Sequence, residues 1–305
     1  MQMSALLTKM LLFVVMIAMG WIGSRKKILT TAFSKGASWL LLNVFLVATI
    51  ASSIISTDAS RYTLRHLGLV LLLSSAVMLL LYLIPGILVR VLPVDKTKET
   101  RLELLMSVVN NMFVALPVAE TLYGTDAVFI LAISCIPFNV LAYTYGIARL
   151  RGEKAKLRLG DIFNVPLVAT LVATLVFMLH IPIPAPIRTV LSGISGGTVP
   201  ISMLIVGATL GTADFSKAIR DRSLYLLALV RFLIVPAAAW LFLKALGVET
   251  VLANTLIIMA ASPCAIIVTA FSIQTGYDGE YTSEGILFTT LLSIITLPIT
   301  AYLIM

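Results

Sequence analysis

The chain has 305 residues, of which 60% are hydrophobic and 12% are charged, and its formal net charge is +8. A soluble domain of this length carries about twice that share of charged residues, so water does not surround most of this surface. The positive charge does not indicate nucleic-acid binding, because the basic residues fall in short clusters between apolar runs and form no basic-aromatic module. The composition predicts a protein whose main partner is the lipid bilayer, with no nucleic acid.

Ten apolar runs are long enough to cross a bilayer as helices, which takes roughly 20 residues each. The first run is followed, not preceded, by Arg25, Lys26 and Lys27, so we predict a retained span and not a signal peptide. The sequence therefore predicts an all-α polytopic membrane protein with ten transmembrane helices. The runs lie near 5–22, 38–56, 67–93, 102–122, 127–149, 162–180, 187–211, 223–246, 251–275 and 283–305.

Lysine and arginine are concentrated in one set of alternate loops between these runs, namely 25–35, 90–101, 149–158 and 217–222. Cytoplasmic loops of membrane proteins carry such an excess. We therefore expect an integral protein of the plasma (cell inner) membrane with both termini outside the cytoplasm.

The cysteines and histidines indicate no chemistry. Cys135 and Cys264 lie inside apolar runs, and His66 and His180 lie far apart at the ends of runs. This pattern favours small buried side chains and interfacial residues over a disulfide or a metal pair. We expect no catalytic residue, no metal and no cofactor.

The longest basic loop, over residues 149–161, divides the predicted spans into five and five. With an odd number of spans per half, a related second half enters the membrane from the opposite side, as in many transporters. An ungapped alignment of the halves places residues 123–126 on 275–278 and Asn110-Asn111 on Ser262-Pro263. The sequence therefore predicts two inverted five-helix repeats, over 1–152 and 153–305.

Helix-breaking residues lie at mid-depth in the fourth and ninth predicted spans. The fourth contains Asn110, Asn111 and Pro117, and the ninth contains Ser262 and Pro263. Interrupted helices at matching places in two halves indicate a transporter's binding site, and helix N-termini favour anions. We predict that these five residues bind substrate. The alternative is a pair of ordinary proline kinks, with the asparagines hydrogen-bonded to neighbouring helices.

Two further charged residues lie inside predicted spans. Glu120 follows Pro117 by about one helical turn, and Arg231 lies in the eighth span. Charged residues inside spans are functional candidates, so both are candidates for coupling or gating. Alternatively, Glu120 reaches the outer interface and Arg231 extends toward the cytoplasmic one.

The chain resembles the auxin efflux carrier family, which includes plant auxin carriers and bacterial permeases for malonate, malate and similar acids. Val47 and Val165 depart from the family pattern, so the resemblance does not specify the substrate. The segments that carry the resemblance are 42–46, 111–117, 122–124, 163–166, 198–203, 207–210 and 230–236.

The resemblance implies an elevator-type carrier. Spans one, two, six and seven would form a scaffold, expected to be a homodimer. Spans three to five and eight to ten would form a moving transport domain, in which helices four and nine cross at the binding site.

Taken together, the sequence predicts a secondary active or facilitative transporter of small organic anions, such as auxin-like or malonate- and malate-like carboxylates. One alternative is a sodium-coupled symporter of the bile-acid type, which would need an acidic and amide-rich cation site. A passive channel is another. An intramembrane enzyme is disfavoured, since no catalytic motif with a partnered histidine, cysteine or acid occurs.

Overall fold

The computed structural model describes residues 2–56, 64–152, 163–212, 215–277 and 279–305. Every named element among these residues is an α-helix or a short π-helical turn, and pairing between extended segments is limited to an isolated bridge. The prediction of an all-α fold is confirmed for the part of the chain that is described.

Among the described residues, six helical runs are long and apolar enough to cross a membrane. They cover Ala32–Ile55, Leu64–Val91, Thr125–Arg151, Ala185–Gly211, Arg222–Ala245 and Glu280–Ile304. Three shorter apolar helices cover Leu11–Arg25, Val165–Met178 and Thr250–Ala260. Ten full-length spans are not seen among the described residues, because the fourth and ninth predicted spans are interrupted and the sixth is short. The apolar stretch Leu11–Arg25 is part of a longer first helix, Gln2–Arg25. The number ten stays a prediction.

Large apolar side chains cover much of the exposed surface, as a membrane protein requires. Leu72 is 66% exposed, Leu241 59%, Val172 56% and Val190 59%. Soluble monomers rarely expose contiguous apolar surface on this scale, so lipid is the solvent for these helices.

The chain forms two compact units, and both are assembled from segments that alternate along the sequence. Unit 1 comprises Met1–Leu71, Met112–Cys135 and Asn164–Thr212, and unit 2 comprises Leu72–Asn111, Ile136–Phe163 and Ala213–Met305. Neither unit coincides with a predicted half, so the repeats over 1–152 and 153–305 stay a prediction.

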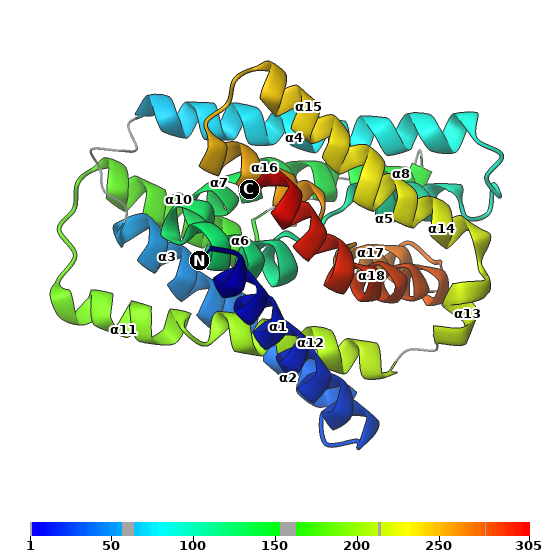
Figure 1. Ribbon diagram of the computed structural model, residues 1–305, viewed down its shortest axis with the longest axis horizontal. Coiled ribbons are helices and arrows are strands. Elements are labelled where there is room, and N and C mark those ends of the chain that lie inside the picture. The colour runs from blue at the N-terminus through cyan, green and yellow to red at the C-terminus, as the bar shows by residue number, and fades with distance from the viewer. Residues whose placement is uncertain (1, 57–63, 153–162, 213–214, 278) are drawn as a thin grey trace. The chain divides into compact units, whose positions relative to one another are not determined.

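Unit 1 contains helices from three separate parts of the chain, which the colours of Figure 1 locate by residue number. Its elements are α1 (Gln2–Arg25), α2 (Thr31–Leu40), η1 (Leu41–Phe45), α3 (Leu46–Ser56), α6 (Leu116–Tyr123), the first part of α7 (Thr125–Leu141), α10 (Val165–Met178), α11 (Ala185–Ser195) and α12 (Thr198–Thr212), with most of η2 (Asn111–Ala115).

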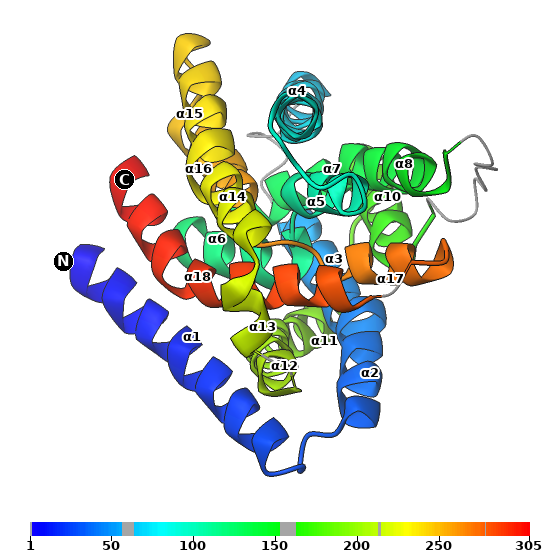
Figure 2. The same ribbon diagram turned by 90° about the vertical axis from the view of Figure 1, so that its right-hand side faces the viewer.

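Unit 2 contains the remaining helices. Its elements are most of α4 (Leu64–Val91), α5 (Glu99–Ser107), the end of α7, η3 (Ala142–Gly146), α8 (Ile147–Arg151), α13 (Phe215–Arg220), α14 (Arg222–Leu229), η5 (Val230–Ile234), α15 (Val235–Ala245), α16 (Thr250–Ala260), α17 (Ile267–Gln274) and α18 (Glu280–Ile304). The segments α14, η5 and α15 follow one another as one continuous helical run (Figure 2).

Glycines allow α1 and α12 of unit 1 to pack backbone against backbone, and the two helices lie side by side (Figures 1 and 2). A Cβ added at Gly207 would lie 2.0 Å from the carbonyl oxygen of Ile17, and one added at Gly20 would lie 2.3 Å from that of Leu204. Without a hydrophobic force between helices in lipid, such close packing of small residues is a main source of their association.

Replacing Gly207 by alanine is therefore expected to push α1 and α12 apart and to lower the melting temperature of the purified protein. The matched control is Gly68→Ala on α4, where an added Cβ meets nothing within 4 Å. There, alanine should be neutral or should stabilise the helix by roughly 0.5–1 kcal/mol. Equal melting temperatures for the two variants would contradict the close packing.

A salt bridge fastens the start of α5 to the start of α14 in unit 2. Lys98 Nζ lies 2.6 Å from Asp221 Oδ2, and Asp221 Oδ1 accepts hydrogen bonds from the backbone and hydroxyl of Ser223. Partial burial opposes the charged form, but these hydrogen bonds outweigh it and hold the pKa of Asp221 below its ordinary value. This link is therefore present at neutral pH and is lost as the pH falls through that lowered pKa.

Candidate functional site

Both predicted interruptions occur in the structure. Helix α5 ends at Ser107, and Val108 is extended, with φ −88° and ψ 109°. The chain resumes a helical course at η2, which begins with Asn111. Helix α16 ends at Ala260, and helix α17 begins only at Ile267.

The two interrupted segments pair with each other inside unit 2. Val109 and Cys264 form an antiparallel bridge. The backbone N–H of Asn110 donates to the carbonyl of Pro263 at 2.8 Å, and that of Ala265 donates to the carbonyl of Val108 at 3.0 Å. Non-helical backbone is tolerated at membrane depth only where protein or a cavity provides partners for its N–H and C=O groups. Here each interrupted segment provides hydrogen-bond partners for the other. We call these paired segments, Val108–Asn111 and Ser262–Ala265, the crossover.

Arg231 stabilises the crossover by donating hydrogen bonds to a backbone carbonyl on each of the two interrupted helices. Its Nε donates to the carbonyl of Ser262 at 2.7 Å, and its Nη1 donates to the carbonyl of Met106 at 2.9 Å. The last carbonyls of a helix lack intrahelical partners and carry partial negative charge. One guanidinium therefore links the carboxyl-terminal end of α5 to the backbone just beyond the end of α16.

The Arg231 guanidinium has one nitrogen that donates no hydrogen bond to the described residues. The side chain is 0% exposed, and its Nη2 has no hydrogen-bond partner among the residues that the structure describes. Its two described partners are neutral carbonyls, and the salt bridges found in the described ranges do not include it. Arg231 lies in the π-helical turn η5, an irregularity that is frequent at functional sites.

Cys264 and Ser262 use their side chains to hold the backbone of the crossover. Cys264 Sγ donates to the carbonyl of Leu105 at 2.9 Å, and its N–H donates to Thr289 Oγ1 at 3.3 Å. The hydroxyl of Ser262 donates to the carbonyl of Ile258 in its own helix at 2.9 Å. Ser262 therefore contributes its carbonyl to Arg231, while its hydroxyl binds back to the last turn of α16.

Unit 2 brings together four of the five residues predicted to bind substrate. Asn110 and Asn111 are 7% and 2% exposed and lie at the crossover with Ser262 and Pro263. Arg231, predicted as a coupling or gating residue, joins the same group through its hydrogen bonds. The substrate-binding role of these residues stays a prediction.

Pro117 and Glu120 lie in unit 1, on helix α6. Pro117 is buried near the start of α6, directly after the π-helical turn η2. Glu120 is half-buried. Neither residue is part of the crossover as unit 2 forms it.

One buried charged residue near the crossover was not singled out by the sequence reasoning. Glu103 on α5 is 0% exposed and forms an ion pair with Arg149 of α8, and the hydroxyl of Tyr145 in η3 donates to it. The rule that ionisable residues inside spans are functional candidates would have found Glu103, which lies at the start of the fourth predicted span.

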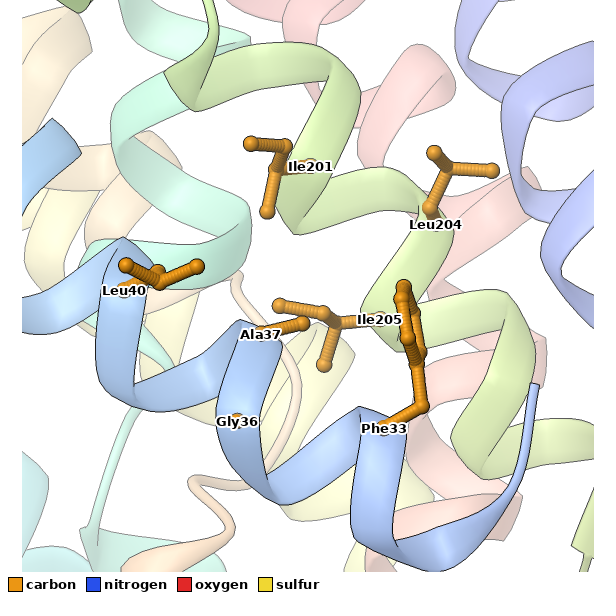
Figure 3. Close-up of a pocket in the computed structure, with 7 residues that line it drawn as sticks. All are labelled: Phe33, Gly36, Ala37, Leu40, Ile201, Leu204 and Ile205. Atoms are coloured by element: carbon orange, nitrogen blue, oxygen red, sulfur yellow. The ribbon is translucent and has the colours of Figure 1, made fainter.

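An apolar pocket in unit 1 is a poor place for a charged ligand. It has a volume of about 340 Å³ between α2 and α12 and is lined by Phe33, Gly36, Ala37, Leu40, Ile201, Leu204 and Ile205 (Figure 3). All seven side chains are apolar or absent, so nothing there offers a hydrogen bond to an anion.

An all-helical fold with exposed apolar helices, and with two interrupted helices paired in its interior, defines the class as an integral membrane transporter. The comparisons with known proteins agree. A family model described as membrane transport protein matches residues 149–301, half of the chain. The chain therefore belongs to this family of auxin efflux carrier-like membrane transport proteins.

The chain is also similar to a transporter from another organism. It is an uncharacterized transporter of Methanothermobacter thermautotrophicus, 25% identical over 219 residues, which cover 67% of this chain and 68% of the relative. The resemblance stated from the sequence is thereby confirmed, and so is the expectation of a transporter and not an enzyme.

Proposed function

We propose that the protein is a secondary active or facilitative transporter of small organic anions, with the crossover as its binding site. The observation that carries the proposal is Arg231. A fully buried guanidinium bonded only to neutral carbonyls among the described residues leaves a positive charge in the membrane interior. Such a charge is costly unless an anion or strong acceptors compensate it, and a carboxylate substrate would supply this compensation.

The same observation disfavours sodium at this place. A sodium site needs oxygen ligands, and two carbonyls that the helix ends present, those of Met106 and Ser262, are already occupied by Arg231. Placing a second cation beside the guanidinium would add charge repulsion in a medium of low dielectric. The bile-acid type of symport therefore gains no support from the geometry of the crossover.

The mechanism we propose is of the elevator type. Spans three to five and eight to ten would carry the substrate, while spans one, two, six and seven would stay fixed as the scaffold of a homodimer. Part of this assignment is supported by unit 2, which contains the crossover and predicted spans eight to ten. The division differs at α6 and the first part of α7, which belong to spans four and five but lie in unit 1.

The test is a thermal-shift screen of the purified protein against mono- and dicarboxylates and indole acids, each with and without sodium. A ligand that binds the folded state stabilises it in proportion to the logarithm of its concentration over its dissociation constant. We expect a carboxylate to raise the melting temperature without sodium. Stabilisation by neutral solutes alone would contradict the proposal.

The proposed orientation predicts which side of the membrane each loop faces. A single cysteine at Lys154 (outside the described residues), at Arg220 or at Gly279 should react with an impermeant maleimide only from the cytoplasm. One at Thr125 should react only from outside. Arg220 and Thr125 are exposed, while the native Cys135 and Cys264 are buried. Labelling at Arg220 from outside would contradict the proposed orientation.

A further inference from the structure

A carboxylate that the proposed function does not use lies one helical turn before the first interruption. The hydroxyl of Ser107, the last residue of α5, donates to the carbonyl of Glu103 at 2.8 Å. The Nε of Arg149 lies 3.1 Å from Glu103 Oε2 and 3.3 Å from Oε1, and its Nη2 also binds Oε2. Tyr145 donates to Oε1. Both carboxylate oxygens are therefore held by strong donors.

Helix α4 packs against Glu103 and Tyr145. A Cβ on Gly86 would lie 3.4 Å from Glu103 Oε1 and 3.6 Å from Tyr145 Oη. One turn earlier, Tyr82 packs edge-to-face on Tyr145, with ring centroids 5.3 Å apart. The buried Tyr82 hydroxyl has no hydrogen-bond partner among the described residues. The cluster is joined to the crossover by the last turn of α5, which runs from Glu103 to Ser107.

The two members of the ion pair differ in their access to water. The side chain of Arg149 is 29% exposed, whereas that of Glu103 is 0% exposed. Arg149 can therefore turn to solvent from the end of α8, but Glu103 cannot follow. A buried carboxylate without its cation is strongly disfavoured, so loss of Arg149 would favour protonation of Glu103. The structure shows the paired state, and a second state, with Glu103 protonated and Arg149 in water, is compatible with this difference in exposure.

We infer that Glu103 is a proton-binding carboxylate coupled to transport. It takes up one proton on its carboxylate as Arg149, which keeps its own charge, moves to water on the cytoplasmic side. The inference rests on the proposed function, because the proton then balances the charge of the anion bound at the crossover. A compensated charge crosses the membrane without work against the transmembrane potential.

Other titratable groups surround α5 but are engaged elsewhere. Arg231 of η5 binds the carbonyls of the crossover, Lys98 of α5 binds Asp221, and Lys217 of α13 binds Glu280 of α18. Helix α17 carries no titratable side chain over Ile267–Gln274. The groups that face Glu103 or its two partners are Tyr82 and Arg90 of α4, Glu99 of α5, Tyr145 of η3 and Arg149 of α8.

The experiment measures uptake of a stabilising carboxylate into proteoliposomes as the pH is varied, for wild type, Glu103→Gln and the double variant Glu103→Gln with Arg149→Gln. Wild-type uptake should rise as the pH falls, by up to about tenfold per pH unit for one linked proton. Both variants should show uptake that does not change with pH, because glutamine mimics the protonated acid. The double variant removes the cation that the single variant leaves without its partner.

One control has the same chemical change at another carboxylate. Glu280→Gln alters an exposed ion pair with Lys217. This variant should keep the wild-type pH profile. A wild type without pH dependence, or an unchanged profile in both Glu103 variants, would overturn the inference. Carboxylate binding in the thermal-shift assay is scored separately, so its absence would overturn the proposed function instead.

Discussion

Replacing Arg231 by glutamine is expected to lower the affinity for the carboxylate by at least about 30-fold, since removal of a buried hydrogen-bonded charge costs 2–5 kcal/mol or more. Glutamine still donates hydrogen bonds, but it has no charge and cannot span both carbonyls that the guanidinium reaches. The dissociation constant of wild type and variant, measured by calorimetry, gives the ratio directly.

Two further variants distinguish the effect of the positive charge of Arg231 from the effect of its hydrogen bonds to the crossover. Arg231→Lys keeps the charge but loses the planar fork that binds Ser262 and Met106 together, so it should retain part of the affinity with a lower melting temperature. Arg222→Met removes an exposed arginine from the start of the same helical run and should change neither quantity. Wild-type affinity in Arg231→Gln would remove this residue from the binding site.

Replacing Asn111 by alanine should weaken binding of the carboxylate by roughly 5- to 150-fold. The reason is that a carboxylate oxygen left unpaired in a water-poor site costs about 1–3 kcal/mol. Asn111 is 2% exposed at the crossover, so no water replaces its amide. Melting in the absence of ligand should change little. Affinity is again read from the dissociation constant.

Asn110→Ala is the matched comparison, because the same side chain is removed from the adjacent residue. Adjacent side chains point in different directions, so the two variants should differ in their effect on affinity. If both variants bind and transport the carboxylate as wild type does, the crossover is a structural break and the substrate binds elsewhere.

The interruptions could be predicted from the sequence because their cost is local. Adjacent amides at Asn110 and Asn111, and a proline at Pro263, are unfavourable inside an uninterrupted membrane helix wherever the rest of the chain lies. The helical class likewise followed from the length of the apolar runs. The length of the apolar runs did not predict the short helices at the interruptions. It also did not predict the division of the chain into two units.

The contacts that make the crossover could not be predicted, since they join residues far apart in the chain. Val109 pairs with Cys264, and Arg231 reaches Met106 as well as Ser262. A sequence shows that Arg231 lies in a span, but it does not show whether the side chain turns toward lipid, water or another helix.

Glu103 was missed for a related reason. It lies at the edge of a predicted span, where an acidic residue is easily explained by the interface, and its cation, Arg149, lies at the edge of a basic loop. Only the tertiary packing of α5 against α8 shows that the carboxylate is 0% exposed. Burial of this kind depends on neighbours that the local sequence does not specify.

The most direct measurement is a set of four dissociation constants, for a stabilising carboxylate and its neutral amide analogue with wild type and with Arg231→Gln. If the anion binds beside the guanidinium, wild type should prefer the carboxylate over the amide by at least about tenfold, and the variant should lose most of that preference. The same preference in both proteins would show that the ligand's charge is not recognised by Arg231 and would contradict an anion site at the crossover.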